Sequence, residues 1–154
     1  NMGGNTGFCN MYMALEALPT RLRKRISGLS IKHDASKTSG GYLRKGFEEV
    51  RDVSQTIGAV HPIIRMHPES GREVLYLGRR LNAYIMDMPV EASEALLDEI
   101  WSYTTREEHI WHHQWRVGDV VFWDNRAVMH RRDAFDAGER RVMHRTQIGD
   151  RLPT

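Results

Sequence analysis

The sequence has a single cysteine, no long apolar run and almost no net charge, and each shortage excludes a class of protein. Cys9 is alone among 154 residues, so no internal disulfide can form. No apolar run reaches the roughly 20 residues that span a bilayer. Lys and Arg number 22 against 20 Asp and Glu, too balanced for neutralising many backbone phosphates. We therefore expect neither a membrane nor nucleic acid as partner.

The start of the chain also lacks the marks of a targeting segment. It opens Asn1-Met2-Gly3-Gly4, without the basic and apolar regions of a signal peptide. With the lone cysteine, this favours the reducing cytoplasm as location. The composition, 40% hydrophobic and 27% charged, is that of one globular domain or part of a larger one.

The spacing of apolar residues predicts short strands with helices at the margins. Helices are expected over 10–18, 19–27 and 91–103. Strands are expected as a hairpin within 60–77 and then over 110–116, 120–123 and 140–148. Strands joined by turns predict a mainly β fold with flanking helices, an α+β sandwich or jelly roll.

Residues 32–58 stand apart because Ser, Gly, Lys and Glu replace the apolar pattern. Loops of this length are uncommon in compact domains and tend to be lids or binding segments. We expect a mobile lid loop here, with a plain surface loop as the alternative.

Eight histidines raise the question of a metal site, and most have a simpler interpretation. His112 and His113 are adjacent and would face opposite sides of a strand, so they cannot easily share an ion. Together with His109 they are interpreted as surface or interface residues. His61 and His67 each precede proline, which favours extended backbone, and are interpreted as hairpin residues.

The most informative stretch runs from residue 123 to residue 146. Arg141, Met143 and Arg145 alternate on one face of the expected last strand, with the arginine α-carbons roughly 13 Å apart. Buried guanidinium groups need carboxylate-like partners. A purely structural arrangement would use the protein's own acids, Asp133, Asp136 and Glu139. The alternative is a pair of small anionic ligands, with His130, just before the turn into this strand, near enough to hold a metal.

Motifs spread over nearly the whole chain resemble one enzyme family. In order they are Gly3-Gly4-Asn5-Thr6, the helix over 11–19, His61-Pro62 with Arg65 and His67-Pro68, Leu75-Tyr76-Leu77-Gly78, Trp115-Arg116-Val117-Gly118-Asp119, and the Trp123-Asp124-Asn125-Arg126 to Arg145 block. Together they resemble the C-terminal half of the iron(II)- and 2-oxoglutarate-dependent dioxygenases of the taurine dioxygenase and 2,4-dichlorophenoxyacetate dioxygenase family. The resemblance implies that residues 1–154 form the C-terminal portion of one double-stranded β-helix (jelly-roll) domain, incomplete in this chain.

The resemblance also implies roles for four residues. His130 matches the distal histidine of the family's facial triad of two histidines and a carboxylate. Arg141 matches the arginine that pairs with the distal carboxylate of 2-oxoglutarate, and Thr6 matches the threonine that supports it. Arg145 matches the anchor for the acidic group of the substrate. The Trp123-Asp124-Asn125 stretch is interpreted as structural, with support of His130 as the alternative.

One departure concerns the other two iron ligands. The family's H-x-D pair is expected about 25 residues before Thr6, and no H-x-D occurs anywhere in the 154 residues. His33-Asp34 has no intervening residue, and the spacing from His130 to Asp133 is wrong. We therefore expect the chain to be the C-terminal part of a longer polypeptide, inactive by itself.

By this resemblance the complete protein uses iron(II), 2-oxoglutarate and dioxygen to hydroxylate a small sulfonate or carboxylate. The alternative is a catalytically inactive jelly-roll module that binds small anions. The substrate's identity and a homo-oligomeric state are left open by the sequence.

Overall fold

The computed structural model describes residues 3–38, 41–78, 81–136 and 138–149, and three helices and eight strands are assigned within these ranges. The helices are α1 (Met11–Glu16), α2 (Thr20–Ile26) and α3 (Val90–Thr104), with 3-10 turns η1 (Val53–Gln55) and η2 (Glu107–His109). The strands are β1 (Thr6–Asn10), β2 (Ser30–Asp34), β3 (Gly58–Pro62), β4 (Ile64–Met66), β5 (Glu73–Leu75), β6 (Tyr84–Ile85), β7 (Ile110–His113) and β8 (Val128–Arg132). Over the described ranges, no helix has the length and apolar character needed to cross a membrane.

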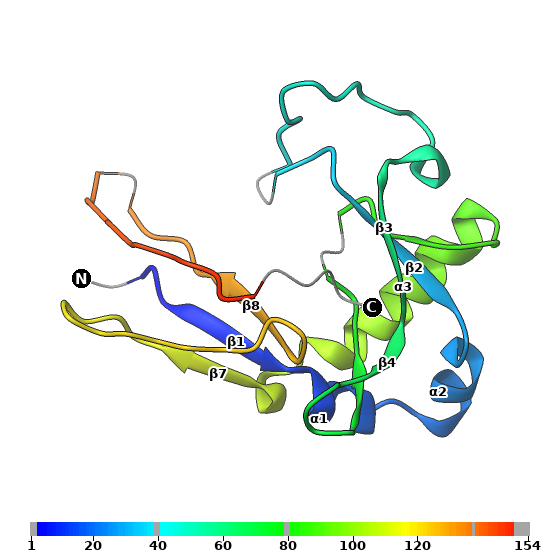
Figure 1. Cartoon of the computed structure of the whole chain (residues 1–154), viewed down its shortest axis with the longest axis horizontal. Helices are drawn as coiled ribbons and strands as arrows, with labels where there is room; N and C mark the ends of the chain where they lie inside the picture. The colour runs from blue at the N-terminus through cyan, green and yellow to red at the C-terminus, as the bar shows by residue number, and fades with distance from the viewer. Residues whose placement is uncertain (1–2, 39–40, 79–80, 137, 150–154) are drawn as a thin grey trace.

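The strands form small antiparallel sheets. Their orders are β7-β1-β8, β3-β2-β6 and β4-β5. Figure 1 shows the first sheet on one side of the molecule, and β2, β3 and β4 with α2 and α3 on the other. The predicted mainly β architecture with few helices is therefore confirmed at this level.

The sheet β7-β1-β8 has two chemically different faces. Cys9 lies opposite Met129 of β8, and both belong to the main hydrophobic core or pack against it. Phe8, the preceding residue, lies opposite His130 on one side and Trp111 on the other. Because directly opposed residues share a face and neighbours along a strand alternate, the aromatic and imidazole rings lie on the face away from the core.

The core forms where the three helices meet the short strands. Its apolar side chains come from all three helices and from the strands and segments next to them, and the fully buried ones include Leu15, Leu22, Ile26, Ile31, Ile63, Leu75, Leu77, Ile85, Leu96, Leu97 and Ile100. Burial of each such side chain contributes about 1.5 to 3 kcal/mol. Burial of the inward-facing side chains of β1, such as Cys9, in this core fixes the orientation of the strand. Because neighbouring residues alternate, it also fixes which side chains lie on the outer face.

The three predicted helices are confirmed, with boundaries shifted by a few residues. The side chain of Asn10 accepts hydrogen bonds from the backbone N–H groups of Tyr12 and Met13 and so caps α1. Pro19 precedes the first residue of α2, and Gly28, at φ +80°, follows its end in the left-handed region that favours glycine.

The predicted strands over 120–123 and 140–148 are wrong. Neither segment forms a strand, whereas residues 128–132 pair with β1 along all five positions as β8. His130 therefore lies within a strand, and not before a turn. The alternation of Arg, Met and His in 140–148 misled the prediction because it buries no side chain on either face in the described structure.

Residues 32–58 are bounded more narrowly than predicted. Residues 32–34 belong to β2 and residue 58 begins β3, which pairs with β2. Asp34 at the end of β2 pairs with Gly58 at the start of β3, so the loop between the two strands comprises residues 35–57. Its described residues hold η1 and an isolated bridge between Lys37 and Leu43. Its role as a lid stays a prediction.

Replacing the cap of α1 tests this account of the junction between β1 and the helix. We expect Asn10→Ala to lower the free energy of unfolding by about 1 kcal/mol, because two backbone N–H groups lose their acceptor. Asn10→Asp keeps an acceptor oxygen and should remain within about 0.5 kcal/mol of the unsubstituted protein. Urea unfolding of both variants is the measurement, and equal losses would contradict the capping role.

Candidate functional site

The imidazole of His130 lies on the outer face of the sheet among aromatic rings. Its centroid is 5.0 Å from that of Trp123 and 6.3 Å from that of Phe8. Burial and the positive charge of Arg145 both lower the pKa of His130. A neutral imidazole keeps a lone pair for a metal ion, and no described residue forms a hydrogen bond with this ring.

His130 also lines a cavity of about 250 Å³. The other lining residues are Met11, Leu75, Tyr76, Leu77, Gly78, Asn125, Arg126, Val128 and Met129. They come from α1, from β5 and the residues after it, and from β8 with the turn before it. The predicted Leu75 to Gly78 motif therefore meets His130 at one cavity, although the two lie more than 50 residues apart in the sequence.

Thr6 begins β1 on the same face as His130 and is buried. Its hydroxyl oxygen accepts a hydrogen bond of 2.9 Å from the indole N–H of Trp115. Within the described ranges the hydroxyl donates no hydrogen bond. Its hydrogen is thus available to an acceptor outside the chain, such as a carboxylate.

Arg141 packs against the glycine pair that precedes Thr6. A Cβ atom on Gly4 would lie 3.4 Å from both Cδ and Nε of Arg141, and Gly4 has a φ of +70°. The backbone N–H of Gly4 donates to the carbonyl of Ala134 at 3.0 Å, which holds the start of β1 against the segment after β8. The positive φ therefore favours glycine at this position, and Arg141 lies in contact range of the backbone just before the strand that carries Thr6.

The positive charge of Arg145 acts on the imidazole of His130, whose pKa it lowers together with burial. Figure 1 shows the stretch before residue 149 running back alongside β8 and β1. No carboxylate of the described chain forms an ion pair with Arg141 or Arg145. The acids predicted as partners of these arginines in the structural alternative contact other groups. Asp133 lies 3.7 Å from Arg131, and the carboxylate of Asp136 accepts a hydrogen bond from the backbone N–H of Gly138.

A polar network fixes the segment that leads into β8. His67, in the turn between β4 and β5, donates from Nε2 to Asp124 at 3.0 Å and accepts at Nδ1 from the backbone of Ser70. Asp124 also pairs with Arg126 at 2.6 Å, and Arg126 reaches Glu69 at 2.8 Å. His67 is therefore a buried hairpin residue that ties the β4-β5 turn to the Asp124 segment.

The same network includes a geometric candidate for a metal site. The ligand atoms of His67, Glu69 and Asp124 lie within 4.8 Å of one another. Both ring nitrogens of His67 already have partners, and the Arg126 guanidinium supplies the positive charge between the two carboxylates. The arrangement is thus that of an ion-pair network, in which Arg126 holds the pKa of Asp124 well below its usual range.

The other histidines are partly as predicted. His112 and His113 bind separate carboxylates, Glu107 and Asp119, each at 3.0 Å. His109 was predicted to be a surface or interface residue, which is wrong: it is buried within the fold, and its Nδ1 contacts the carbonyl of Thr104 at 3.0 Å. His109 lies five residues after the end of α3, and its imidazole pairs with the carbonyl of Thr104, one of the groups without a partner inside the helix.

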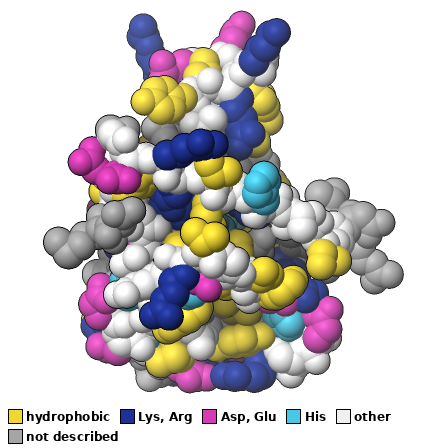
Figure 2. Space-filling model, turned by 90° about the vertical axis from the view of Figure 1, so that its left-hand side faces the viewer, with side chains coloured by type: hydrophobic (Ala, Val, Ile, Leu, Met, Phe, Trp, Pro, Cys, Tyr) yellow, Lys and Arg dark blue, Asp and Glu magenta, His cyan; other side chains and the backbone are white. Residues whose placement is uncertain are grey.

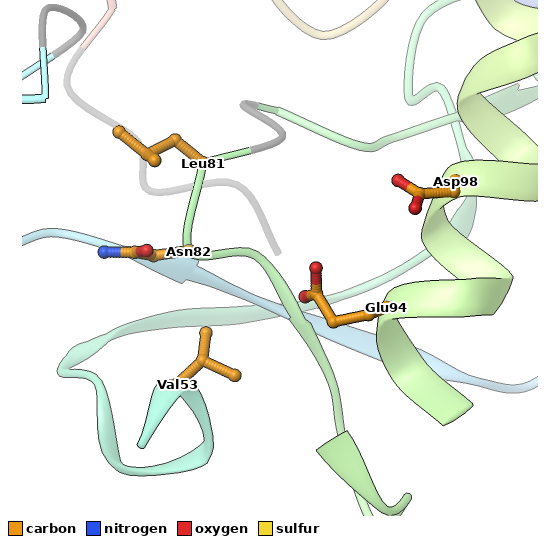
Figure 3. A pocket seen from close by; sticks show the side chains of 5 residues that line it. All are labelled: Val53, Leu81, Asn82, Glu94 and Asp98. Atoms are coloured by element: carbon orange, nitrogen blue, oxygen red, sulfur yellow. The ribbon is translucent and has the colours of Figure 1, made fainter. Parts of the chain in front are cut away.

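A larger cavity, of about 540 Å³, lies apart from the predicted residues. Figure 3 shows Glu94 and Asp98 of α3 with their carboxylates toward it, together with Leu81, Asn82 and Val53. None of the four predicted site residues lines this cavity.

The surface in Figure 2 has charges of both signs interspersed with hydrophobic side chains. That face, the side of the molecule on which the sheet β7-β1-β8 lies, presents no continuous basic stripe of the kind that tracks a nucleic-acid backbone. The Lys and Arg side chains on this face lie among acidic and hydrophobic ones.

An imidazole can ligate a metal ion, and guanidinium groups without a described carboxylate partner can bind small organic acids. The family model described as taurine catabolism dioxygenase TauD, TfdA family, matches residues 1–147. The chain therefore belongs to the TauD/TfdA family.

Individual relatives agree with this assignment. The chain is 34% identical over 149 residues to the alpha-ketoglutarate-dependent 2,4-dichlorophenoxyacetate dioxygenase of Cupriavidus pinatubonensis, covering 96% of this chain and 51% of that protein. It is 33% identical to the (S)-phenoxypropionate/alpha-ketoglutarate-dioxygenase of Sphingobium herbicidovorans, covering 96% and 53%. The chain thus spans about half the length of the curated relatives it matches.

Solved structures give the same picture. The crystal structure of AAD-2 in complex with Mn(II) and N-oxalylglycine superposes with a TM-score of 0.74 at 31% identity, covering 89% of this chain and 54% of that one. A taurine dioxygenase from Burkholderia xenovorans gives 0.68 at 32% identity, covering 86% and 41%. The fold is therefore that of one portion of these dioxygenase structures.

The ion pair of Asp124 predicts an acid sensitivity of the fold. A carboxyl group with a depressed folded pKa stabilises the protein above its unfolded pKa, about 4, and loses that contribution as pH falls toward the folded value. We expect Asp124→Asn to cost about 1 kcal/mol at pH 6, since the pair is partly exposed. Below pH 4 the difference from the unsubstituted protein should shrink.

Urea unfolding at pH 6, and in steps from pH 4 downward, measures the difference in the free energy of unfolding between Asp124→Asn and the unsubstituted protein. Asp136→Asn is the matched control, because Asp136 contacts only the backbone of Gly138 among the described residues, a contact that asparagine keeps. A pH-independent loss for Asp124→Asn would contradict the electrostatic account.

Proposed function

We propose that the complete protein is an iron(II)- and 2-oxoglutarate-dependent dioxygenase that hydroxylates a small organic acid. The observations that carry this proposal are two guanidinium groups, those of Arg141 and Arg145, that no described carboxylate neutralises. Arg141 lies against Gly4, two residues before Thr6, and the charge of Arg145 acts on the imidazole of His130. An unpaired guanidinium is a ready partner for a carboxylate or sulfonate, which it binds through two parallel hydrogen bonds.

The residues present fit part of the implied iron and 2-oxoglutarate site. His130 offers an imidazole whose pKa is lowered, so that a ring nitrogen keeps a lone pair for a ferrous ion, and no described residue occupies that nitrogen through a hydrogen bond. Arg141 would bind the distal carboxylate of 2-oxoglutarate, and the Thr6 hydroxyl would donate a hydrogen bond to the same carboxylate. When bound, the iron and 2-oxoglutarate together supply the oxidation of a substrate C–H bond by dioxygen.

The remaining iron ligands belong to the proposal for the whole protein. In this proposal an H-x-D pair outside these 154 residues completes the facial triad. Within the complete domain, β7-β1-β8 and the other small sheets would form part of a double-stranded β-helix. The aromatic rings of Phe8 and Trp123 would exclude water from one side of the metal ligand.

The substrate class follows from Arg145 and from the relatives. The charge of Arg145 acts on the imidazole of His130, and Arg145 has no described ion-pair partner, so it would fix the acidic group of a substrate close to the metal. Relatives are named for phenoxyacetate, phenoxypropionate and sulfonate substrates. We propose a small carboxylate or sulfonate, over which the segment 35–57 could close as a lid.

Substitution of the two arginines tests the division of their roles. In the full-length enzyme, we expect Arg141→Ala to raise the KM for 2-oxoglutarate about 10- to 100-fold, because charge-assisted hydrogen bonds to a carboxylate are lost. Arg145→Ala should raise the KM for the primary substrate by a similar factor. Steady-state kinetics with each substrate varied in turn make the measurement.

Arg140→Ala is the matched control, since Arg140 is an exposed neighbour outside the proposed site. It should leave both KM values within about 2-fold. Equal effects of Arg141→Ala and Arg145→Ala on both KM values would reject the assignment.

Iron content tests the metal ligand. We expect the full-length protein, loaded anaerobically with Fe(II), to hold about one equivalent, and His130→Gln to lose most of it, since one of three ligands is removed. His144→Gln, in the exposed segment after Arg141, should retain the iron. Absence of iron from the unsubstituted full-length protein would instead support an inactive anion-binding module.

A further inference from the structure

We propose that Trp115 is a positioning residue for 2-oxoglutarate, which acts by orienting the hydroxyl group of Thr6. The proposal rests on the function proposed above and adds to it a residue with no assigned role. Its basis is the hydrogen bond of 2.9 Å from the indole Nε1 of Trp115 to the Thr6 hydroxyl oxygen.

The direction of this hydrogen bond decides what Thr6 can do. An indole N–H can only donate, so the Thr6 oxygen must be the acceptor. A threonine hydroxyl has one hydrogen, and with one lone pair engaged by Trp115 that hydrogen must point elsewhere. No described residue accepts this hydrogen, although Thr6 is buried, with only 7% of its surface exposed. The hydroxyl is thus preset as a donor toward the outer face of the sheet, where a carboxylate would need it.

Trp115 is itself held by its neighbours. Its ring meets the ring of His113 edge-on at 4.6 Å between centroids. Asp119 accepts hydrogen bonds from both His113, at 3.0 Å, and the backbone N–H of Arg116, at 2.9 Å. The carboxylate therefore clamps the turn that follows Trp115 to the end of β7, and the indole N–H is aimed at Thr6 before any ligand arrives.

The segment 115–119 thereby gains a physical role. Trp115 and Asp119 are 109 and 113 residues from Thr6 in the sequence, yet the fold brings the indole onto the hydroxyl because β7 pairs with β1. Thr6 lies opposite His113 in this register. Trp115 follows two residues after His113, and its indole reaches back to the Thr6 hydroxyl at the start of β1. The contact thus depends on the pairing of β7 with β1 as well as on the local turn that holds Trp115.

Binding of 2-oxoglutarate to the full-length protein tests the proposal without turnover. With Mn(II) in place of iron and no oxygen, calorimetry gives the Kd of 2-oxoglutarate for each variant. We expect Trp115→Phe to raise this Kd about 2- to 10-fold, the effect of one neutral hydrogen bond in a buried site. In steady-state assays of the iron enzyme, the KM for 2-oxoglutarate should rise while the KM for the primary substrate stays unchanged.

A double-mutant cycle separates positioning from simple packing. Thr6→Val removes the hydroxyl and should raise the Kd by itself. In the Thr6→Val background, Trp115→Phe should have no further effect, because its partner is gone. Trp101→Phe is the matched control: its indole Nε1 is buried on α3 and has no described hydrogen-bond partner, so the Kd should stay at the unsubstituted value.

The outcomes distinguish this proposal from the one on which it rests. If the unsubstituted full-length protein does not bind 2-oxoglutarate, the proposed function fails and this inference with it. If it binds, but Trp115→Phe leaves the Kd unchanged or adds its full effect to that of Thr6→Val, the positioning role alone is overturned. The positioning role is supported if Trp115→Phe raises the Kd of 2-oxoglutarate in the unsubstituted protein but causes no further rise in the Thr6→Val background.

Discussion

The pairing of β1 with β8 is the constraint on which the candidate site depends. Five residues of β1 pair with five of β8, and the period of two sends alternate side chains to opposite faces. Cys9 and Met129 thereby enter the core, while Phe8 and His130 share the outer face. A shift by one residue would bury the imidazole and expose the core side chains, so the burial of the inner face fixes the place of the candidate ligand.

Local sequence signals predicted the helices well because their causes are local. The cap at Asn10 and the left-handed Gly28 act within a few residues of the helix ends. Strand prediction failed where pairing decides: 140–148 alternates but is exposed, whereas Val128–Arg132 has little alternation and becomes a strand because β1 lies beside it. His109 was misplaced for a related reason, since its burial depends on the end of α3.

The candidate site divides in the same way. The resemblance to a family singled out His130, Arg141, Arg145 and Thr6 from their motifs, and their roles stay predictions. The contacts that hold Thr6 and the Asp124 segment, from Trp115 and His67, link residues 109 and 57 positions apart. The proline after His67 predicted the hairpin position of His67 but carried no signal for its carboxylate partner, Asp124. Such contacts arise from sheet register and hairpin packing, which a single sequence does not specify.

Charge distribution explains why the arginines near the sheet remain available. Arg126 is held by two carboxylates and an adjoining imidazole network, and it serves the fold. Arg141 packs its aliphatic and Nε atoms against Gly4, which leaves the end of its guanidinium for a ligand. A residue with a side chain at Gly4 would be strained by the positive φ, although its Cβ would meet Arg141 at an ordinary contact distance. Gly4 thus fixes the backbone just before the strand that carries Thr6, and the Arg141 side chain lies against that backbone.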